Sequence, residues 1–188
     1  LSLFPYHTWV PDVYQGSTSA MAGFLSVVPK MAGFVVALRF FEIFMQVNDV
    51  IIQTMLYVTV VLTITIPNLI ALQQKDIKRM LSYSSISNAG MAMAAIVIGT
   101  QQAINGLFLY WILFTVTNLG AFGMLWLNRG KEFNDYGSPY TFKKFSGLAQ
   151  ISPFTASIFG IFLFALTGLP PFALFWGKMY IVASAVNA

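Results

Sequence analysis

Long apolar stretches alternate with short polar links along the whole chain. After an opening piece at residues 1–9, the apolar stretches lie at 17–43, 50–72, 81–100, 103–127 and 152–188. A helix needs about 20 apolar residues to cross the hydrocarbon core of a bilayer, and each of these stretches reaches that length. The pattern therefore predicts an all-α, polytopic transmembrane helix bundle.

The last stretch, 152–188, is too long for one straight crossing. Gly168, Pro170 and Pro171 interrupt it, and each half alone is slightly short of a span. Two prolines in succession remove two backbone donors and leave carbonyls that need other partners. The stretch is therefore either one helix broken inside the membrane or a hairpin of two helices.

Composition agrees with a lipid environment. The chain is 57% hydrophobic and 9% charged, with a mean hydropathy of +0.74, whereas soluble domains carry about 25% charged residues. It has no Cys, one His and six scattered acids, which excludes disulfides and thiolate sites and leaves no plausible metal cluster. Because the opening residues LSLF have the character of an apolar segment, we expect an internal portion of a longer protein.

Basic residues are concentrated in two of the polar links. One link holds Lys75, Lys78 and Arg79 and the other holds Arg129, Lys131, Lys143 and Lys144, whereas the links on the other side hold only Arg39. An excess of Lys and Arg marks the cytoplasmic side of a membrane protein. Binding of anionic lipid is compatible with this orientation. Nucleic-acid binding is not expected, because no basic domain stands outside the membrane.

Lys30 lies near the middle of the stretch 17–43, among uncharged residues. An ionisable side chain at bilayer depth costs from about 3 to more than 10 kcal/mol, and such residues usually mark ion or proton paths. The alternative is a lysine whose side chain extends to the membrane surface. Either end of the predicted helix is about 20 Å from Lys30, which is beyond the reach of the side chain. Pro29 cannot donate to the carbonyl of Leu25, so we expect a loosened turn and a small polar pocket beside Lys30.

Three further residues are candidates for the same path. Lys178 follows the break at 168–171, and no other charge lies between Lys144 and the end of the chain; a lysine beside such a break is expected to face a wet cavity. His7 lies between Pro5 and Pro11, where a regular helix is not expected, and is either a structural or a titrating residue. Asp12 is predicted to start a turn or to cap the next helix.

Three motifs resemble one known family. They are FPYHTWVPDVYQG at 4–16, ALQQKDIKRMLSYSSISNAG at 71–90 and LTGLPPFALFWGK at 166–178. Together they resemble the antiporter-like subunits of proton-pumping NADH-quinone oxidoreductase, respiratory complex I. PDVYQG resembles subunit N, whose mitochondrial equivalent is NADH dehydrogenase subunit 2, more than subunits L and M or the multi-subunit sodium/proton antiporters.

The resemblance implies an antiporter-like fold with discontinuous helices. A whole subunit would have fourteen helices with two inverted five-helix repeats, and residues 1–188 would be an internal portion covering about helices seven to twelve of one transmembrane domain. The breaks near 5–11 and 168–171 would interrupt helices seven and twelve, and paired interruptions of this kind mark transport sites. Lys30 and Lys178 match the lysines of helices eight and twelve. The lysine of helix seven and the glutamate of helix five would precede Leu1.

By the same resemblance, protons would pass from Lys30 through water and polar groups to Lys178. His7 is a further candidate for the path because of its own chemistry. Burial disfavours a charged amine and a neighbouring carboxylate favours it, so the helix-five and helix-seven ion pair would control Lys30. Many relatives carry His where this chain has Asn88, which argues against a proton role at that position. Asn68, Asn118, Thr63 and Thr65 either extend the path or serve interhelical packing.

The chain itself would hold no cofactor, and NADH, FMN, iron-sulfur clusters and quinone are expected in partner subunits. The partners would be the neighbouring subunit M, small membrane subunits, lipids and protons, in a bacterial inner membrane rather than a mitochondrial one. Two alternatives remain open: a stand-alone cation/proton antiporter subunit, and a purely structural membrane subunit whose lysines bind lipid headgroups.

Overall fold

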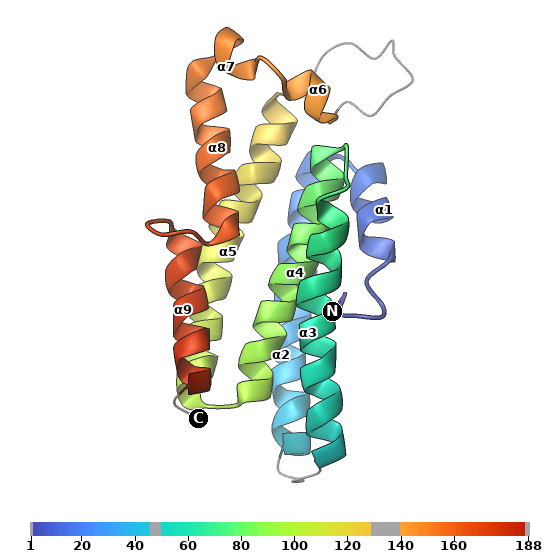
Figure 1. Ribbon diagram of the computed structural model, residues 1–188, viewed down its shortest axis with the longest axis vertical. Coiled ribbons are helices and arrows are strands. Elements are labelled where there is room, and N and C mark those ends of the chain that lie inside the picture. The colour runs from blue at the N-terminus through green and yellow to red at the C-terminus, as the bar shows by residue number, and fades with distance from the viewer. Residues whose placement is uncertain (1, 46–49, 129–139, 187–188) are drawn as a thin grey trace.

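A computed structural model of the chain describes residues 2–45, 50–128 and 140–186 (Figure 1). These residues are helical, apart from turns and an isolated bridge between Asp76 and Thr141, which confirms the all-α class. The helices are α1 (Trp9–Gly16), α2 (Ser19–Met45), α3 (Val50–Ala71), α4 (Ile77–Ile98), α5 (Gln101–Leu127), α6 (Phe142–Phe145), α7 (Leu148–Ile151), α8 (Pro153–Thr167) and α9 (Ala173–Val186).

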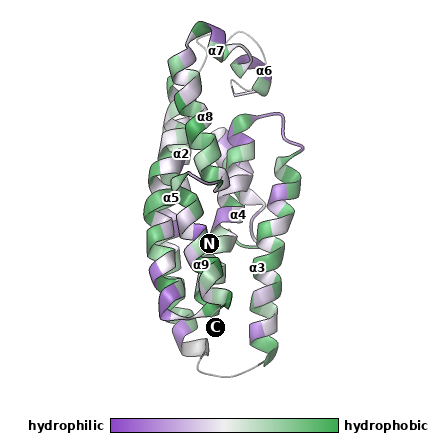
Figure 2. Cartoon of the chain, turned by 60° about the vertical axis from the view of Figure 1, so that its left-hand side comes forward, coloured by the Kyte–Doolittle hydropathy of each residue, from purple (hydrophilic) through white to green (hydrophobic). Residues whose placement is uncertain are grey.

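Four of the described helices are long and apolar enough to cross a membrane: Ser19–Glu42 of α2, α3, α4 and α5. Each begins within about four residues of the apolar stretch that predicted it, and α2 and α3 continue through Pro29 and Pro67. Figure 2 shows hydrophobic residues over most of the length of the helices. The chain is a multi-pass membrane protein, as the hydropathy pattern predicts.

Local signals set the ends of α4 and α5. The Asp76 carboxylate accepts a hydrogen bond from the Arg79 amide at 3.0 Å, which caps the start of α4. Gly99 ends α4 in the left-handed conformation, with φ of 69°, where a residue without Cβ is favoured. The Thr100 hydroxyl then accepts from the Ala103 amide at 3.2 Å and caps α5. Two residues therefore suffice to reverse the chain between two spans.

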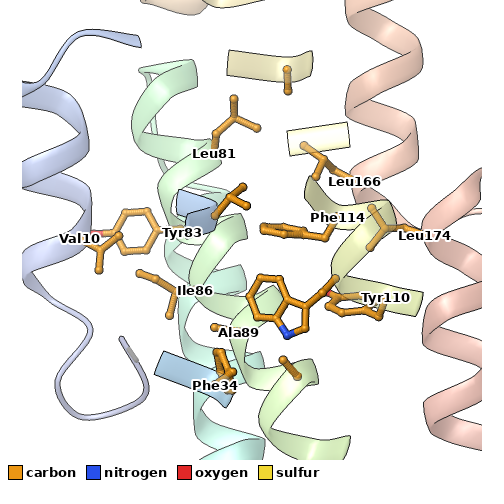
Figure 3. Packing of buried hydrophobic residues seen from close by; sticks show 14 of the residues in the cluster. Val10, Phe34, Leu81, Tyr83, Ile86, Ala89, Tyr110, Phe114, Leu166 and Leu174 are labelled. Carbon is orange, nitrogen blue, oxygen red and sulfur yellow. The ribbon is translucent and has the colours of Figure 1, made fainter. Parts of the chain in front are cut away.

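Helix α4 lies inside the bundle and contacts α1, α2, α3, α5 and α9. Figure 3 shows Ile86 and Ala89 of α4 in the core between Val10 of α1 and the rings of Tyr110 and Phe114. A Cβ on Gly90 would lie 2.8 Å from the Ile64 side chain, so α3 approaches α4 too closely there for any larger residue. Helix α4 is therefore the element around which α1, α2, α3, α5 and α9 pack.

The break in the last stretch is where the sequence predicts it. Helix α8 ends at Thr167, Gly168 has φ of 76°, and α9 begins at Ala173. Both helices contact α5. Helix α9 continues in the same direction as α8, and both lie along α5 (Figure 1). The alternative of a hairpin is therefore wrong, and the stretch is one interrupted helix.

The opening segment departs from its prediction. Residues 4–8 form turns, but a regular helix, α1, begins at Trp9 and contains Pro11 in its first turn, where the missing proline amide has no helical partner to lose. Asp12 neither starts a turn nor caps the next helix, because it lies inside α1. The Thr18 hydroxyl caps α2 instead, accepting from the Met21 amide at 3.3 Å.

The two basic links meet at one end of the bundle. The Ile77 amide donates to the Tyr140 carbonyl at 2.9 Å, and the Phe142 amide donates to the Lys75 carbonyl at 3.2 Å. Two short helices that the sequence did not indicate, α6 and α7, continue this end of the molecule. Arg129 and Lys131 lie outside the described residues.

Candidate functional site

Lys30 is enclosed by protein in the middle of α2. Its side chain is 5% exposed, and its ammonium donates to the Ser85 hydroxyl at 2.7 Å and to the Ser85 carbonyl at 3.0 Å. Both acceptors come from α4, across the interface between the two helices. The lysine therefore faces the protein interior and does not extend along α2 to either membrane surface.

Small residues allow this close arrangement. A Cβ on Gly23 would lie 3.0 Å from Phe122 of α5, so α2 and α5 are in contact one to two turns before Lys30. At the same level the Asn118 amide donates to the Ser26 hydroxyl, which donates to the Gly23 carbonyl at 2.6 Å. Hydrogen-bonded polar groups therefore lie one helical turn from Lys30, and α2 remains continuous through Pro29.

Tyr14 of α1 lies beside Ser85. Its side chain is 1% exposed, and it is close enough to interact with the Ser85 hydroxyl. One serine of α4 is thus adjacent to a lysine of α2 and to a tyrosine of the helix that follows the turns at 4–8.

Lys178 lies at the break between α8 and α9. Its ammonium donates to the Thr167 carbonyl at 3.0 Å, one of the acceptors left without a helical partner where α8 ends. A Cβ on Gly168 would lie 2.9 Å from Lys178 Cδ and 3.1 Å from its Nζ. The side chain is half-buried and folds over the glycine, so the broken helix and its lysine form one local unit.

Lys178 also lines a cavity of about 370 Å³. Its polar lining comes from four helices, α3, α4, α8 and α9: Asn68, Ser84, Ser87, Asn88, Thr167 and Lys178. The remaining lining is apolar, but the volume and these polar side chains are sufficient for several water molecules. The wet cavity that the sequence predicts beside Lys178 therefore has a matching space in the structure.

Residues of α4 separate Lys30 from this cavity. Ser85 faces Lys30, whereas Ser84 and Asn88, one helical turn apart, line the cavity. The Tyr110 hydroxyl donates to the Asn88 amide oxygen at 2.7 Å, and the Asn88 amide nitrogen lies 3.4 Å from the Ser84 hydroxyl. The described hydrogen bonds thus link Lys30 to Ser85 on one side of α4, and Tyr110 and Ser84 to Asn88 on the other. They do not form a continuous path between the two sides.

His7 lies apart from both lysines. It is 6% exposed, its ring lies 5.6 Å from that of Phe4, and its Nδ1 is buried without a partner among the described residues. The Phe4 amide donates to the Thr63 hydroxyl at 2.9 Å and fixes this turn against α3. The described hydrogen bonds do not join His7 to Lys30 or Lys178.

Sequence reasoning missed a third enclosed lysine, Lys78. It is 1% exposed, its ammonium donates to the carbonyls of Gln15 and Ser17, and it lies 4.9 Å from the centre of the Tyr140 ring. It thus satisfies carbonyls at the end of α1. The neighbouring Arg79 pairs with Asp12 at 2.9 Å, so the basic link also has a structural role in holding α1.

Among the described residues, no three His, Cys, Asp or Glu side chains are grouped as a metal site requires.

Comparison with known proteins gives concordant matches. A family model described as NADH:quinone oxidoreductase/Mrp antiporter, TM, matches residues 1–188. NADH-quinone oxidoreductase subunit N of Sulfurimonas denitrificans is 54% identical over 188 residues, which cover 100% of this chain and 38% of that protein. The subunit N of Campylobacter hominis is 50% identical over 191 residues, covering 100% and 39%. The chain thus spans less than two fifths of the length of these curated relatives.

Solved structures show the same fold. A chain of respiratory complex I from Thermus thermophilus with bound Aureothin matches with a TM-score of 0.78 and 31% identity, over 99% of this chain and 39% of that one. A chain of the membrane-bound sulfane sulfur reductase, an archaeal respiratory membrane complex, matches with a TM-score of 0.85 and 28% identity, over 98% and 37%.

Proposed function

The chain belongs to the NADH:quinone oxidoreductase/Mrp antiporter transmembrane family, and from this membership we propose that it is the central part of a proton-translocating subunit N. The resemblance to subunit N that the three motifs carry is confirmed by the relatives, and the antiporter-like fold by the solved structures. As part of a subunit N it would contain about helices seven to twelve of fourteen, within one transmembrane domain.

The observation that carries the proposal is the position of Lys30. A lysine enclosed at mid-span, with a hydroxyl and a carbonyl from another helix as its acceptors, is costly to maintain. Hydrogen bonds favour the charged ammonium, whereas removal from water favours the neutral amine. A group balanced between these two effects is suited to accept and release a proton as its surroundings change.

Lys178 would receive the proton on the far side of α4. The Ser85 hydroxyl accepts from Lys30 and still has a hydrogen to donate, and water in the cavity beside Ser84 would complete the transfer to Lys178. The Asn88 side chain has no group that takes up or releases a proton at physiological pH, so its role would be to orient water through its amide. His7, with a buried ring nitrogen that lacks a partner, would serve the entry or exit of protons near α3.

The remainder of the assembly follows from the same proposal. NADH, FMN, iron-sulfur clusters and quinone would be bound by partner subunits, and this chain would perform no covalent chemistry. Its neighbours would be the antiporter-like subunit M and small membrane subunits, in a bacterial inner membrane. Oxidation of NADH elsewhere would drive proton transfer here through electrostatic changes around Lys30.

The test replaces Lys30 in the full-length subunit of the intact complex. Lys30→Ala should abolish most NADH-driven proton uptake into inverted membrane vesicles and lower quinone reductase activity with it, while the complex remains assembled. Lys143→Ala, at an exposed lysine, is the matched control and should pump at the parental rate. Parental pumping by an assembled Lys30→Ala complex would overturn the proposed role.

Purification separates the proposal from its rival. A subunit of the oxidoreductase should co-purify with redox-active partners. A stand-alone antiporter should instead exchange cations for protons when it is reconstituted alone, and that result would replace the proposal.

A further inference from the structure

A second cavity lies at the end of the bundle opposite the basic links. It is open on one side, has a volume of about 590 Å³ and is lined by α2, the end of α4 and the start of α5. Its walls are mainly apolar, with Val35, Leu38 and Phe41 from α2 and Ile104 and Phe108 from α5. None of the residues assigned above to proton transfer lines it, so it is separate from that site.

The cavity continues as a narrow slot toward the middle of the bundle. The slot, about 60 Å³ in volume, shares Val35, Leu38 and Phe108 with the cavity and reaches Met31 and Trp111. From Glu42 to Met31 the groove follows eleven residues of α2, or about 16 Å. A volume of about 60 Å³ is too small for a helix, which is about 10 Å in diameter, and suits part of a single hydrocarbon chain.

The mouth of the groove carries two opposite charges side by side. Arg39 and Glu42 both line the cavity, with Arg39 Nη1 and Glu42 Oε2 separated by 3.7 Å and both side chains largely exposed. They lie near the end of the membrane-spanning part of α2, at the depth of lipid headgroups. An anionic headgroup would meet the Glu42 carboxylate, whereas a zwitterionic one would meet complementary charge at both of its ends.

We propose that this groove binds one phospholipid with an ethanolamine headgroup. The phosphate pairs with Arg39, the ammonium pairs with Glu42, and one acyl chain enters the slot between α2 and α5. The site is independent of proton transfer, so a complex with Lys30→Ala binds the lipid as the parent does.

The test uses phosphatidylethanolamine with a photoactivatable diazirine in its acyl chain, incorporated into vesicles with the intact complex. After irradiation, mass spectrometry of this chain should find the label on residues lining the groove, such as Met31 or Phe108. Val35→Trp fills the groove and should abolish this labelling. Val36→Trp is the matched control, because Val36 is 68% exposed and does not line the groove; its labelling should be unchanged.

Headgroup specificity is tested in the same vesicles. Glu42→Gln should reduce labelling by the ethanolamine lipid by about fivefold, as expected for loss of one exposed ion pair, and increase labelling by a phosphatidylglycerol probe. Exchanging the two charges, Arg39→Glu with Glu42→Arg, should preserve labelling by the ethanolamine lipid.

Absence of label from the groove of the parental complex would overturn the proposal and indicate that protein covers this surface. Stronger labelling by phosphatidylglycerol than by phosphatidylethanolamine would overturn the zwitterionic assignment. Equal loss of labelling in Val35→Trp and Val36→Trp would show that the lipid does not occupy the groove.

Discussion

The Lys30 ammonium donates to the hydroxyl and to the carbonyl of the same residue, Ser85, at 2.7 and 3.0 Å. Only the hydroxyl can be removed by mutation, and only the hydroxyl can pass a proton onward. The two acceptors therefore have different roles. The carbonyl holds the lysine against α4, and in the proposed transfer the hydroxyl would pass the proton onward.

Ser85→Ala should separate these roles. A hydrogen bond to a charged group contributes about 1.5–3 kcal/mol, so we expect coupled proton pumping to fall about tenfold while the carbonyl keeps Lys30 in place and the complex assembles. Ser82→Ala is the control, because the Ser82 hydroxyl is equally buried but donates to the Arg79 carbonyl of its own helix. Equal loss of pumping in both variants would show that Ser85 has no particular part in transfer.

Lys30→Arg tests whether the charge alone is sufficient. Arginine retains a positive charge and hydrogen-bond donors, but it does not release a proton in the physiological range. We expect the variant to assemble and to pump as poorly as Lys30→Ala, measured as protons translocated per NADH oxidised. Parental pumping would mean that Lys30 acts as a fixed charge.

Hydropathy was sufficient to predict the spans, because each apolar stretch is long and the links between them are short. It also placed Lys30 inside the bundle and the break at 168–171, since a charge at mid-span and a Gly-Leu-Pro-Pro sequence are local signals. The sequence does not predict helix α1, because Pro5 and Pro11 both indicate helix breaks, whereas Pro11 lies in the first turn of α1.

The sequence alone does not predict which side chains of one helix contact another helix. Ser85 and Ser84 are adjacent and chemically identical, yet one faces Lys30 and the other faces the cavity. Which side each takes depends on how α4 is rotated against α2 and α3, and that rotation is set by packing such as the approach of Ile64 to Gly90. The burial of Lys78 against the end of α1 also depends on such contacts, so its position in a basic link does not predict it.

Membrane orientation can be tested at two described residues. The basic links meet at one end of the bundle and should face the cytoplasm, whereas the start of α5 lies at the other end (Figure 1). In a full-length subunit without other cysteines, Gln150→Cys in α7 should react with an impermeant thiol reagent only in inverted vesicles. Gln102→Cys in α5 should react only from the periplasmic side, in cells whose outer membrane is permeabilised and whose inner membrane is intact. The reverse pattern would overturn the orientation.

Gly168→Ala tests whether the break positions Lys178. Gly168 has φ of 76°, a conformation that costs an ordinary residue about 1–2 kcal/mol, and a Cβ there would lie 2.9 Å from Lys178 Cδ. The lysine must therefore move away from the Thr167 carbonyl, and we expect coupled pumping to fall severalfold together with a lower melting temperature of the complex. Gly160→Ala in the same helix, α8, is the control, because its Cβ meets nothing within 4 Å and alanine favours a helix over glycine by about 1 kcal/mol. If Gly168→Ala lowers only the melting temperature and leaves pumping at the parental level, the position of Lys178 at the break is not required for proton transfer.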